Sequence, residues 1–250
     1  MSELVLLCPI PIFMSSTFYR WFSDRQLTRF GQARRDRIQS FRLSLLHKHR
    51  SAPGDIVEIG PGTGGFAKLA MSSGWSYRGF DASEMLVNEL RSGGLEVAQA
   101  WVPPIPMDDH SCDVVYADQV LEHMSGIDMA REFVNEAWRV LRRGGVFLVV
   151  VPDYLKEREF FWDIDYTHNF VTTDRRVRQL LYDGGFEMEE MVRSIGATTG
   201  FGRNMLAAAA LFVNIPGVDA LSLFLRVEEF LFRIRKNLFE TLSFVVRKPL

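Results

Sequence analysis

The sequence contains only two cysteines, Cys8 and Cys112, among its 250 residues. Two cysteines cannot form a disulfide framework or a zinc site built from cysteines, so we expect a reduced, cytoplasmic protein. No segment reaches the ~18 consecutive apolar residues that a membrane-spanning helix needs. The first fourteen residues are apolar, but Glu3, Pro9 and Pro11 interrupt them, which argues against a signal peptide.

An excess of charge of one sign is also lacking, because the formal net charge is only -2. The charges are nevertheless unevenly distributed. Residues 1–50 carry nine Lys/Arg against three Asp/Glu, residues 51–204 carry 14 against 24, and residues 205–250 carry six against four. No basic run contains a nucleic-acid recognition motif, so nucleic acid is not an expected partner. Basic, apolar-rich flanks instead indicate an amphiphilic or phosphate-bearing partner, with peripheral contact to a membrane.

Short apolar segments alternate with amphipathic segments from residue 54 onward. This alternation predicts an α/β fold whose mostly parallel sheet carries helices on both faces. Strands are expected at residues 56–59, 77–80, 95–98, 112–117, 146–151, 186–194 and 241–247. Helices are expected at residues 64–71, 83–90, 128–141, 174–182 and 221–238. The glycine pairs at residues 144–145 and 184–185 are expected to end the helices that precede them.

Two helical additions accompany this α/β pattern. Residues 17–46 predict a basic amphipathic helix, and a break follows at residues 51–54. We therefore divide the chain into an N-terminal extension, residues 1–53, and an α/β domain, residues 54–250, with a helical insertion at about residues 197–240. Both additions are expected to form a lid over a binding site, or else an extra helical layer.

A glycine-rich turn follows the first expected strand, with glycines at positions 60, 62 and 64. Glycines allow a ligand to approach the bare main chain, and the N-terminus of the following helix attracts an anionic group. Asp81 lies nineteen residues after Gly62, at the end of the next strand, where a carboxylate can bind both hydroxyls of a ribose. The turn and the acid together predict an adenosine-containing cofactor, and the pattern fits NAD equally well.

Four segments, in order and correctly spaced, resemble the class I S-adenosylmethionine-dependent methyltransferases, especially their type-11-like group. The resemblance covers about residues 54–194 and the terminal strand. It implies a three-layer, Rossmann-like fold with a mostly parallel seven-stranded sheet. The segments that carry it are residues 57–66, 80–86, 106–116, and 120–124 with 139–145.

The resemblance implies S-adenosylmethionine as the cofactor and S-adenosylhomocysteine as the product. It assigns cofactor binding to the residues that occupy its motifs: Glu58, Gly60, Gly62, Gly64, Asp81, Ala82 and Met85. The family's adenine-binding acid is replaced here by Trp101, so apolar contact and the main-chain N–H of Val102 are expected to hold the base. Asp118 and Gln119 are expected to bind the methionine end of the cofactor or to line the acceptor pocket.

Methyl transfer to a hydroxyl requires a general base, and histidine is the side chain suited to that role near neutral pH. His168 lies in a loop after the fifth strand, where Asp165 could orient it, and His123 follows the fourth strand. The alternative for Asp165 and His168 is that they only satisfy an irregular loop, and the alternative for His123 is that it only packs and caps. If His168 is the base, replacing it with alanine lowers turnover by about 10²-fold. No carboxylate–histidine group has ligand spacing along the sequence, so no metal is expected.

The sequence therefore predicts methyl transfer, foremost to an oxygen atom of a small or amphiphilic acceptor such as a lipid-linked molecule, a glycan or a natural product. Transfer to nitrogen or carbon stays open. Two other functions also stay open: an NAD(P)-dependent oxidoreductase, and a non-catalytic, methyltransferase-like binding subunit. The sequence predicts no oligomeric state.

Overall fold

The computed structural model describes residues 28–215 and 217–250, so Cys8 and the first part of the expected basic helix lie outside the described residues. Seven strands form one sheet in the described part of the chain. They are β1 (Asp55–Ile59), β2 (Ser76–Asp81), β3 (Val97–Gln99), β4 (Cys112–Asp118), β5 (Leu141–Pro152), β6 (Glu187–Ile195) and β7 (Glu240–Arg247).

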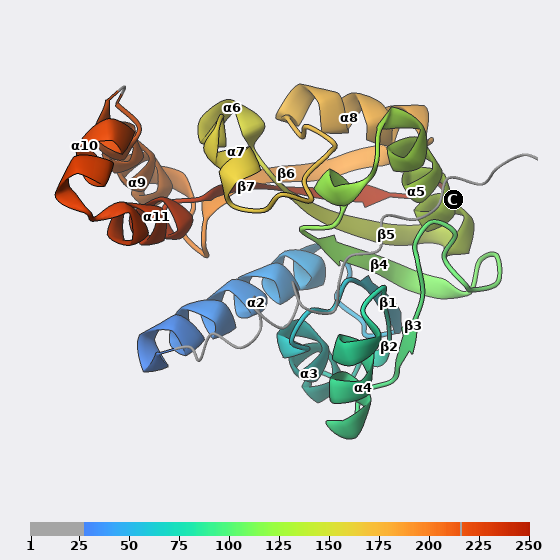
Figure 1. Cartoon of the computed structure of the whole chain (residues 1–250). Coiled ribbons are helices and arrows are strands. Elements are labelled where there is room, and N and C mark those ends of the chain that lie inside the picture. The colour runs from blue at the N-terminus through green and yellow to red at the C-terminus, as the bar shows by residue number, and fades with distance from the viewer. Residues whose placement is uncertain (1–27, 216) are drawn as a thin grey trace, which may run out of the picture.

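Helices surround this sheet on both faces (Figure 1). They are α2 (Arg29–His49), α3 (Gly65–Ser72), α4 (Glu84–Ser92), α5 (Ile127–Val140), α6 (Tyr154–Glu157), α7 (Phe160–Asp163), α8 (Asp174–Asp183), α9 (Gly200–Val213), α10 (Val218–Leu225) and α11 (Glu228–Asn237), with a short 3-10 helix, η1 (Leu121–His123). Ser83 begins α4 as expected, because its hydroxyl accepts a hydrogen bond from the N–H of Leu86.

The strand order is β3-β2-β1-β4-β5-β7-β6, and the chain reverses direction across the sheet between β1 and β4. Strand β7 is antiparallel to β5 and β6, whereas β1 to β5 pair in parallel, so the sheet is mixed rather than purely parallel. The carboxyl ends of the parallel strands meet at one edge, named here the C-terminal edge. In open α/β sheets, ligands bind at this edge, where the strand order reverses.

Alternating side chains of the central strands feed two apolar layers. In β4, Val115 and Ala117 face the layer that contains α5 and α8, while Val114 and Tyr116 face the layer that contains α2, α3 and α4. Helices therefore cover both faces of the sheet, and the expected three-layer fold is confirmed (Figure 1).

Helix α2 packs into the second layer. Leu43 and Leu46 are buried against the sheet, and the guanidinium of Arg42 reaches hydroxyls on β7. Because α2 shares the core, we propose that residues 29–49 belong to the same domain as the sheet, and that any lid role is confined to other parts of the extension.

Two local expectations were wrong. Gly144 and Gly145 do not end a helix but lie inside β5, where Gly144 has a φ of +73° and the register with β4 shifts. The glycines thus form a bulge in the strand. The single helix expected over residues 221–238 is broken into α10 and α11 at Arg226, which has a left-handed backbone.

Helices α9, α10 and α11 form an arm at one end of the sheet (Figure 1). Among residues 28–215 and 217–250, no single helix has the length and apolar character to cross a membrane. Helices α9 and α10 taken together do reach that length and apolarity, with a bend of 68° between them.

Candidate functional site

The glycine-rich turn lies at the C-terminal edge between β1 and α3, and its three alternate glycines all have positive φ angles. A Cβ atom at Gly60 would lie 2.9 Å from Val120 Cγ2, and one at Gly64 would lie 2.7 Å from Leu90 Cδ2. At Gly62, by contrast, a Cβ atom would meet no described atom within 4 Å. Packing therefore favours glycine at the outer two positions, whereas no described side chain lies against Gly62, whose main chain is left bare on that side.

Asp81 lies beside this turn, at the end of β2. Its nearly buried carboxylate accepts a hydrogen bond from the N–H of Ser83 at 2.8 Å. Burial raises the pKa of Asp81, and the N–H groups of Ser83 and Gly62 partly oppose that shift. Ala82 and Met85 are half-buried directly after it. The structure thus brings the predicted ribose-binding acid and the bare glycine together.

Glu58 lies in β1 below the turn and is buried. The hydroxyl of Tyr77 donates a hydrogen bond to its carboxylate at 2.6 Å. Burial raises the pKa of Glu58 to about 8, although the Tyr77 hydrogen bond opposes the shift. Glu58 is therefore tied to β2 through Tyr77, and direct contact with a cofactor stays a prediction.

The loop after β3 carries the two residues predicted to hold an adenine. Trp101 is exposed, and Val102 is half-buried and packs against the main apolar layer. The indole of Trp101 is thus available to cover a flat ligand, and its role stays a prediction.

Asp118 and Gln119 occupy the end of β4. The carboxylate of Asp118 accepts a hydrogen bond from the hydroxyl of Tyr116 at 2.8 Å and from Arg42 Nε at 3.3 Å. Gln119 has a φ of +58°, and its buried amide nitrogen has no hydrogen-bond partner among the described residues. A buried donor without a partner is rare, which makes this amide a candidate group for binding a polar ligand.

Arg42 is a residue that the sequence analysis missed. It is almost fully buried, and its guanidinium also donates to the hydroxyls of Thr241 at 3.0 Å and Ser243 at 2.7 Å. It therefore ties α2 to the C-terminal edge at Asp118. Its position among many arginines of a basic segment gave no signal that it would be the buried one.

His123 is held by two residues of the loop after α7. Asp165 accepts a hydrogen bond from the Thr167 hydroxyl at 2.6 Å, and that hydroxyl lies 2.8 Å from His123 Nδ1. Because the hydroxyl proton points to the carboxylate, Thr167 accepts from His123, and the neutral ring carries its proton on Nδ1. Asp165 thus orients His123 through Thr167. No hydrogen bond between the Asp165 carboxylate and His168 is present within the described ranges, so the expectation that Asp165 orients His168 stays a prediction.

His168 lies beside His123, with ring centroids 4.9 Å apart. Its Nδ1 donates to the carbonyl of Phe161 at 2.6 Å, so its Nε2 also stays unprotonated in the neutral ring. Burial lowers the pKa of His123 to about 4, with the neighbouring imidazole adding to the shift, and burial also lowers the pKa of His168. Both histidines are therefore neutral near pH 7.

Glu122 completes this group and was not predicted as a site residue. Its side chain is fully buried, and neither carboxylate oxygen has a partner in the described part of the chain. Burial raises the pKa of Glu122 well above its ordinary value, with further contributions from Asp118 and Asp165. We name Glu122, His123 and His168 the strand-end cluster. The Leu-Glu-His turn after an apolar strand was the only available signal.

The strand-end cluster could hold a metal ion, which spacing along the sequence did not reveal. One donor atom from each member lies within 4.8 Å of the other two. Donors around a tetrahedral zinc with bonds of 2.0–2.1 Å lie roughly 3.4 Å apart, so the side chains would have to move closer to bind one. The expectation of no metal thus needs a direct test.

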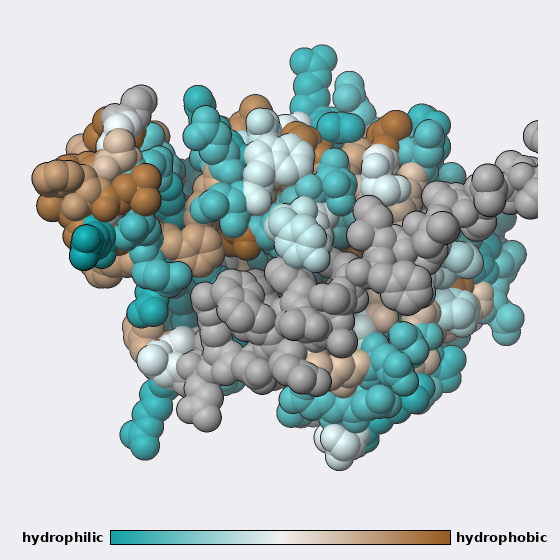
Figure 2. Space-filling view, viewed as in Figure 1, coloured by the Kyte–Doolittle hydropathy of each residue, from teal (hydrophilic) through white to brown (hydrophobic). Residues whose placement is uncertain are grey.

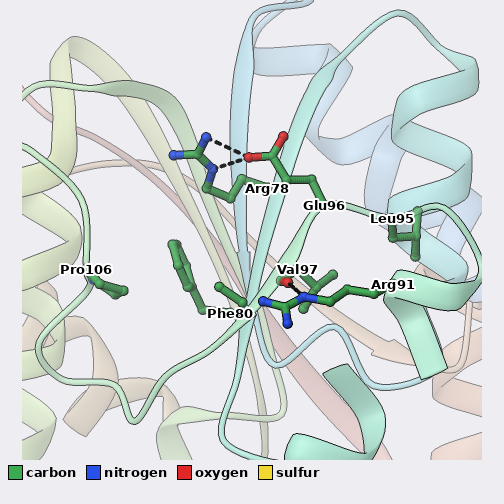
Figure 3. Close-up of a pocket in the computed structure, with 8 residues that line it drawn as sticks. Arg78, Phe80, Arg91, Leu95, Glu96, Val97 and Pro106 are labelled. Atoms are coloured by element: carbon green, nitrogen blue, oxygen red, sulfur yellow. Dashed lines mark hydrogen bonds and ion pairs between the residues drawn. The ribbon is translucent and has the colours of Figure 1, made fainter. Parts of the chain in front are cut away.

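A cavity of about 390 Å³ opens elsewhere, beside β2 and β3 (Figure 3). In this view the ion pair between Arg78 and Glu96 lies above Phe80, and Pro106 lies to the left of Phe80. Its lining includes neither the glycine-rich turn nor Asp81. We therefore do not assign it to the cofactor.

Comparisons with known proteins agree with this geometry. The family model described as "Methyltransferase domain" matches residues 57–149, which run from β1 into β5. A probable S-adenosylmethionine-dependent methyltransferase of Mycolicibacterium smegmatis is 33% identical over 147 residues, or 57% of this chain. The chain spans 55% of the length of that relative.

Solved structures share the fold at low sequence identity. A candidate sarcosine dimethylglycine methyltransferase from Galdieria sulphuraria has a TM-score of 0.62 and 15% identity, covering 94% of this chain and 98% of that one. The [4+2]-cyclase SpnF has a TM-score of 0.55 and 19% identity, covering 86% and 81%. The chain is thus similar to methyltransferases over residues 57–149, and its fold is that of the class I S-adenosylmethionine-dependent methyltransferases.

Proposed function

We propose that this protein transfers the methyl group of S-adenosylmethionine to a hydroxyl oxygen. The observation that carries the cofactor part is the bare main chain of Gly62 beside the buried carboxylate of Asp81, at the point where the strand order reverses. Such a juxtaposition suits a ribose and its neighbouring groups. The amide nitrogen of Gln119 offers a further donor that lacks a partner among the described residues.

When bound, S-adenosylmethionine supplies an already activated methyl group. The protein's own tasks are then to orient the acceptor oxygen and to remove its proton. In this proposal Gly62 approaches the cofactor through its main chain, Asp81 accepts hydrogen bonds from the ribose, and Gln119 donates to an anionic group. The packing of Val120 on Gly60 brings the turn that carries His123 next to the glycine-rich turn.

His123 is the base that we propose, in place of the first choice from sequence, His168. His123 as a residue is half-buried, whereas His168 is almost fully buried, and this difference favours His123 as the residue that an acceptor reaches. The hydrogen-bonded chain from Asp165 through Thr167 favours the Nδ1–H form, in which Nε2 is the nitrogen that takes up a proton. The same chain stabilises the imidazolium that would form. Asp165 and Thr167 are thus positioning residues.

The acceptor is proposed to be an amphiphile that reaches the site beside the helical arm. The structural likeness to a [4+2]-cyclase is a reminder that the fold alone does not determine the reaction. Methyl transfer therefore has to be tested directly.

The test measures transfer of a labelled methyl group to a panel of hydroxyl-bearing acceptors: methyl glycosides, phenols and polyprenyl alcohols in detergent. We expect His123→Gln to lower kcat by about 10²-fold or more, the usual range for a general base. Thr167→Val should lower kcat without changing cofactor affinity, and Thr167→Ser, which keeps the hydroxyl, should restore it. The acid limb of kcat/KM should fall near the His123 pKa of about 4.

Dialysis against a chelator separates base catalysis from metal catalysis in the same assay. The proposal expects unchanged kcat after chelation. A stoichiometric metal that His168→Gln removes, together with metal-dependent kcat, would assign the strand-end cluster to a cation instead. Transfer to amines but to no hydroxyl acceptor would contradict O-methylation.

A further inference from the structure

The helical arm, residues 200–237, exposes large apolar side chains over most of its surface. Helix α9 has no buried residue, and Phe201, Phe212 and Phe224 are 80%, 73% and 83% exposed. Figure 2 shows the hydrophobic colour gathered over this arm. Other exposed members are Met205, Leu211, Ile215, Leu221, Leu223, Leu225, Val227 and Phe230. A contiguous apolar surface of this kind marks an interaction site.

The charges of α9 and α10 are neutralised within the protein. Arg203 and Asp219 are the two ionisable side chains between residues 200 and 225. Arg203 pairs with the buried carboxylate of Glu240, and Asp219 pairs with Arg235 at 2.6 Å. These pairings lower the cost of bringing the two helices against hydrocarbon, although the Asp219 carboxylate itself stays exposed.

The arrangement of the apolar side chains favours lipid over a protein partner. Leu223, Phe224 and Leu225 are consecutive and all exposed, and successive residues of a helix point about 100° apart. A docked protein covers one face of a helix, whereas lipid surrounds it. Together α9 and α10 have the length and apolarity of a membrane segment, but the 68° bend prevents a straight crossing. A bent apolar pair suits entry into one leaflet.

The arm is joined directly to the candidate site. It connects the end of β6 to the start of β7, and both lie at the C-terminal edge because β7 is antiparallel to β6. Phe232 of α11 packs against Phe160 of α7 with ring centroids 5.5 Å apart. The next residue, Phe161, holds His168 through its carbonyl. A cavity of about 250 Å³ lies where α9 and α11 meet α6, lined partly by Ala207 and Leu238.

We propose that α9 and α10 insert into one leaflet of a lipid bilayer and bring the strand-end cluster to the membrane surface. The acceptor is then a membrane lipid whose head group carries a hydroxyl. This second part rests on the proposed methyl transfer, whereas the insertion does not. It differs from the sequence-based expectation of electrostatic contact through basic flanks, because exposed acids as well as bases occur on α11, as at Glu229 and Arg233.

Vesicle flotation of the full chain tests the insertion. We expect binding to vesicles of pure phosphatidylcholine as well as to vesicles containing phosphatidylglycerol, and we expect it to persist at high salt because apolar burial is not screened. The double variant Phe212→Ser/Phe224→Ser should lower the partition coefficient about ten-fold or more, since two large apolar side chains leave the hydrocarbon. Tyr182→Ser, which changes an exposed aromatic residue of α8 away from the arm, should leave it unchanged.

Calorimetric binding of S-adenosylhomocysteine serves as the folding control for each variant. Binding only to anionic vesicles at low salt, or binding that the double variant does not weaken, would overturn the proposal. Failure to bind vesicles would also overturn it. If the protein then sediments as a dimer that Phe212→Ser/Phe224→Ser dissociates, a second copy of the chain covers the arm. Vesicle binding without methyl transfer would retain the insertion and reject the proposed function. Methyl transfer without vesicle binding would retain the proposed function and reject the insertion.

Discussion

Gly62 differs from the other glycines of its turn, because a Cβ atom there would meet no described atom within 4 Å. We expect Gly62→Ala to destabilise the fold by only about 1 kcal/mol, the scale of a left-handed alanine. It should weaken S-adenosylhomocysteine binding much more, because the new methyl group occupies space meant for the ligand. Calorimetry and urea unfolding measure the two effects.

Gly94→Ala is the matched control for this prediction. Gly94 also has a positive φ, 84°, and a Cβ atom there also meets no described atom within 4 Å, but it lies in the turn between α4 and β3. The two variants should lose similar stability, and only Gly62→Ala should lose affinity. Equal affinities would remove Gly62 from the cofactor site.

Buried acids give the stability of this protein a defined pH dependence. Burial raises the pKa of Glu157 from 4.5 to about 8, so the folded chain keeps a proton that the unfolded chain has already released. The free energy of unfolding should therefore fall as pH rises from 4.5 to 8. The pKa of His123 is lowered from 6.5 to about 4, so this residue has the opposite effect. Its contribution lowers the free energy of unfolding as pH falls from 6.5 to about 4.

Glu157→Gln should flatten the decline in urea midpoint between pH 5 and pH 8. Its amide oxygen can still accept the hydrogen bond that Glu157 receives from the N–H of Glu240. Glu96→Gln, at an exposed position, serves as the control. An unchanged slope in Glu157→Gln would show that this carboxyl is ionised in the folded state.

At the scale of elements, α2 is anchored by one buried arginine. Arg42→Ala should lower the free energy of unfolding by about 2–3 kcal/mol, somewhat below the range for a fully buried pair because Asp118 keeps some contact with solvent. Arg37→Ala, an exposed position on the same helix, should change it by less than about 0.5 kcal/mol. Similar losses in urea unfolding would contradict the anchoring role of Arg42.

The sequence predicted most strands and helices within a few residues, because apolar runs and glycine turns act locally. It failed at Gly144, where pairing with β4 and β7 turns an apparent helix stop into a strand bulge. It also failed at Arg226, which breaks a continuous amphipathic pattern by adopting a left-handed backbone. In both cases the outcome depends on packing that no local pattern encodes.

In the candidate site, too, the residues set by local sequence were predictable and those set by long-range contacts were not. The glycine-rich turn and Asp81 were predictable because each follows its own strand at a recognisable spacing. The partnership of Thr167 with His123 was not, because it joins residues 44 positions apart through a single hydrogen bond. Glu122 was hidden for a related reason, since only the fold shows that it is buried and lies beside two imidazoles.

Considered as a whole, the molecule places the glycine-rich turn with Asp81, the strand-end cluster and the apolar arm at one edge of its sheet. The proposed roles of the cluster and the arm in methyl transfer both presuppose that a cofactor binds at the glycine-rich turn. Calorimetric titration with S-adenosylhomocysteine, with NADH as the competing ligand, tests this binding most directly.

We predict one-site binding of S-adenosylhomocysteine and no measurable binding of NADH. Asp81→Asn should weaken the former about ten-fold or more, the scale of losing a hydrogen bond to a charged group. Binding of NADH alone, or affinity for S-adenosylhomocysteine that Asp81→Asn and Gly62→Ala both leave intact, would contradict the account.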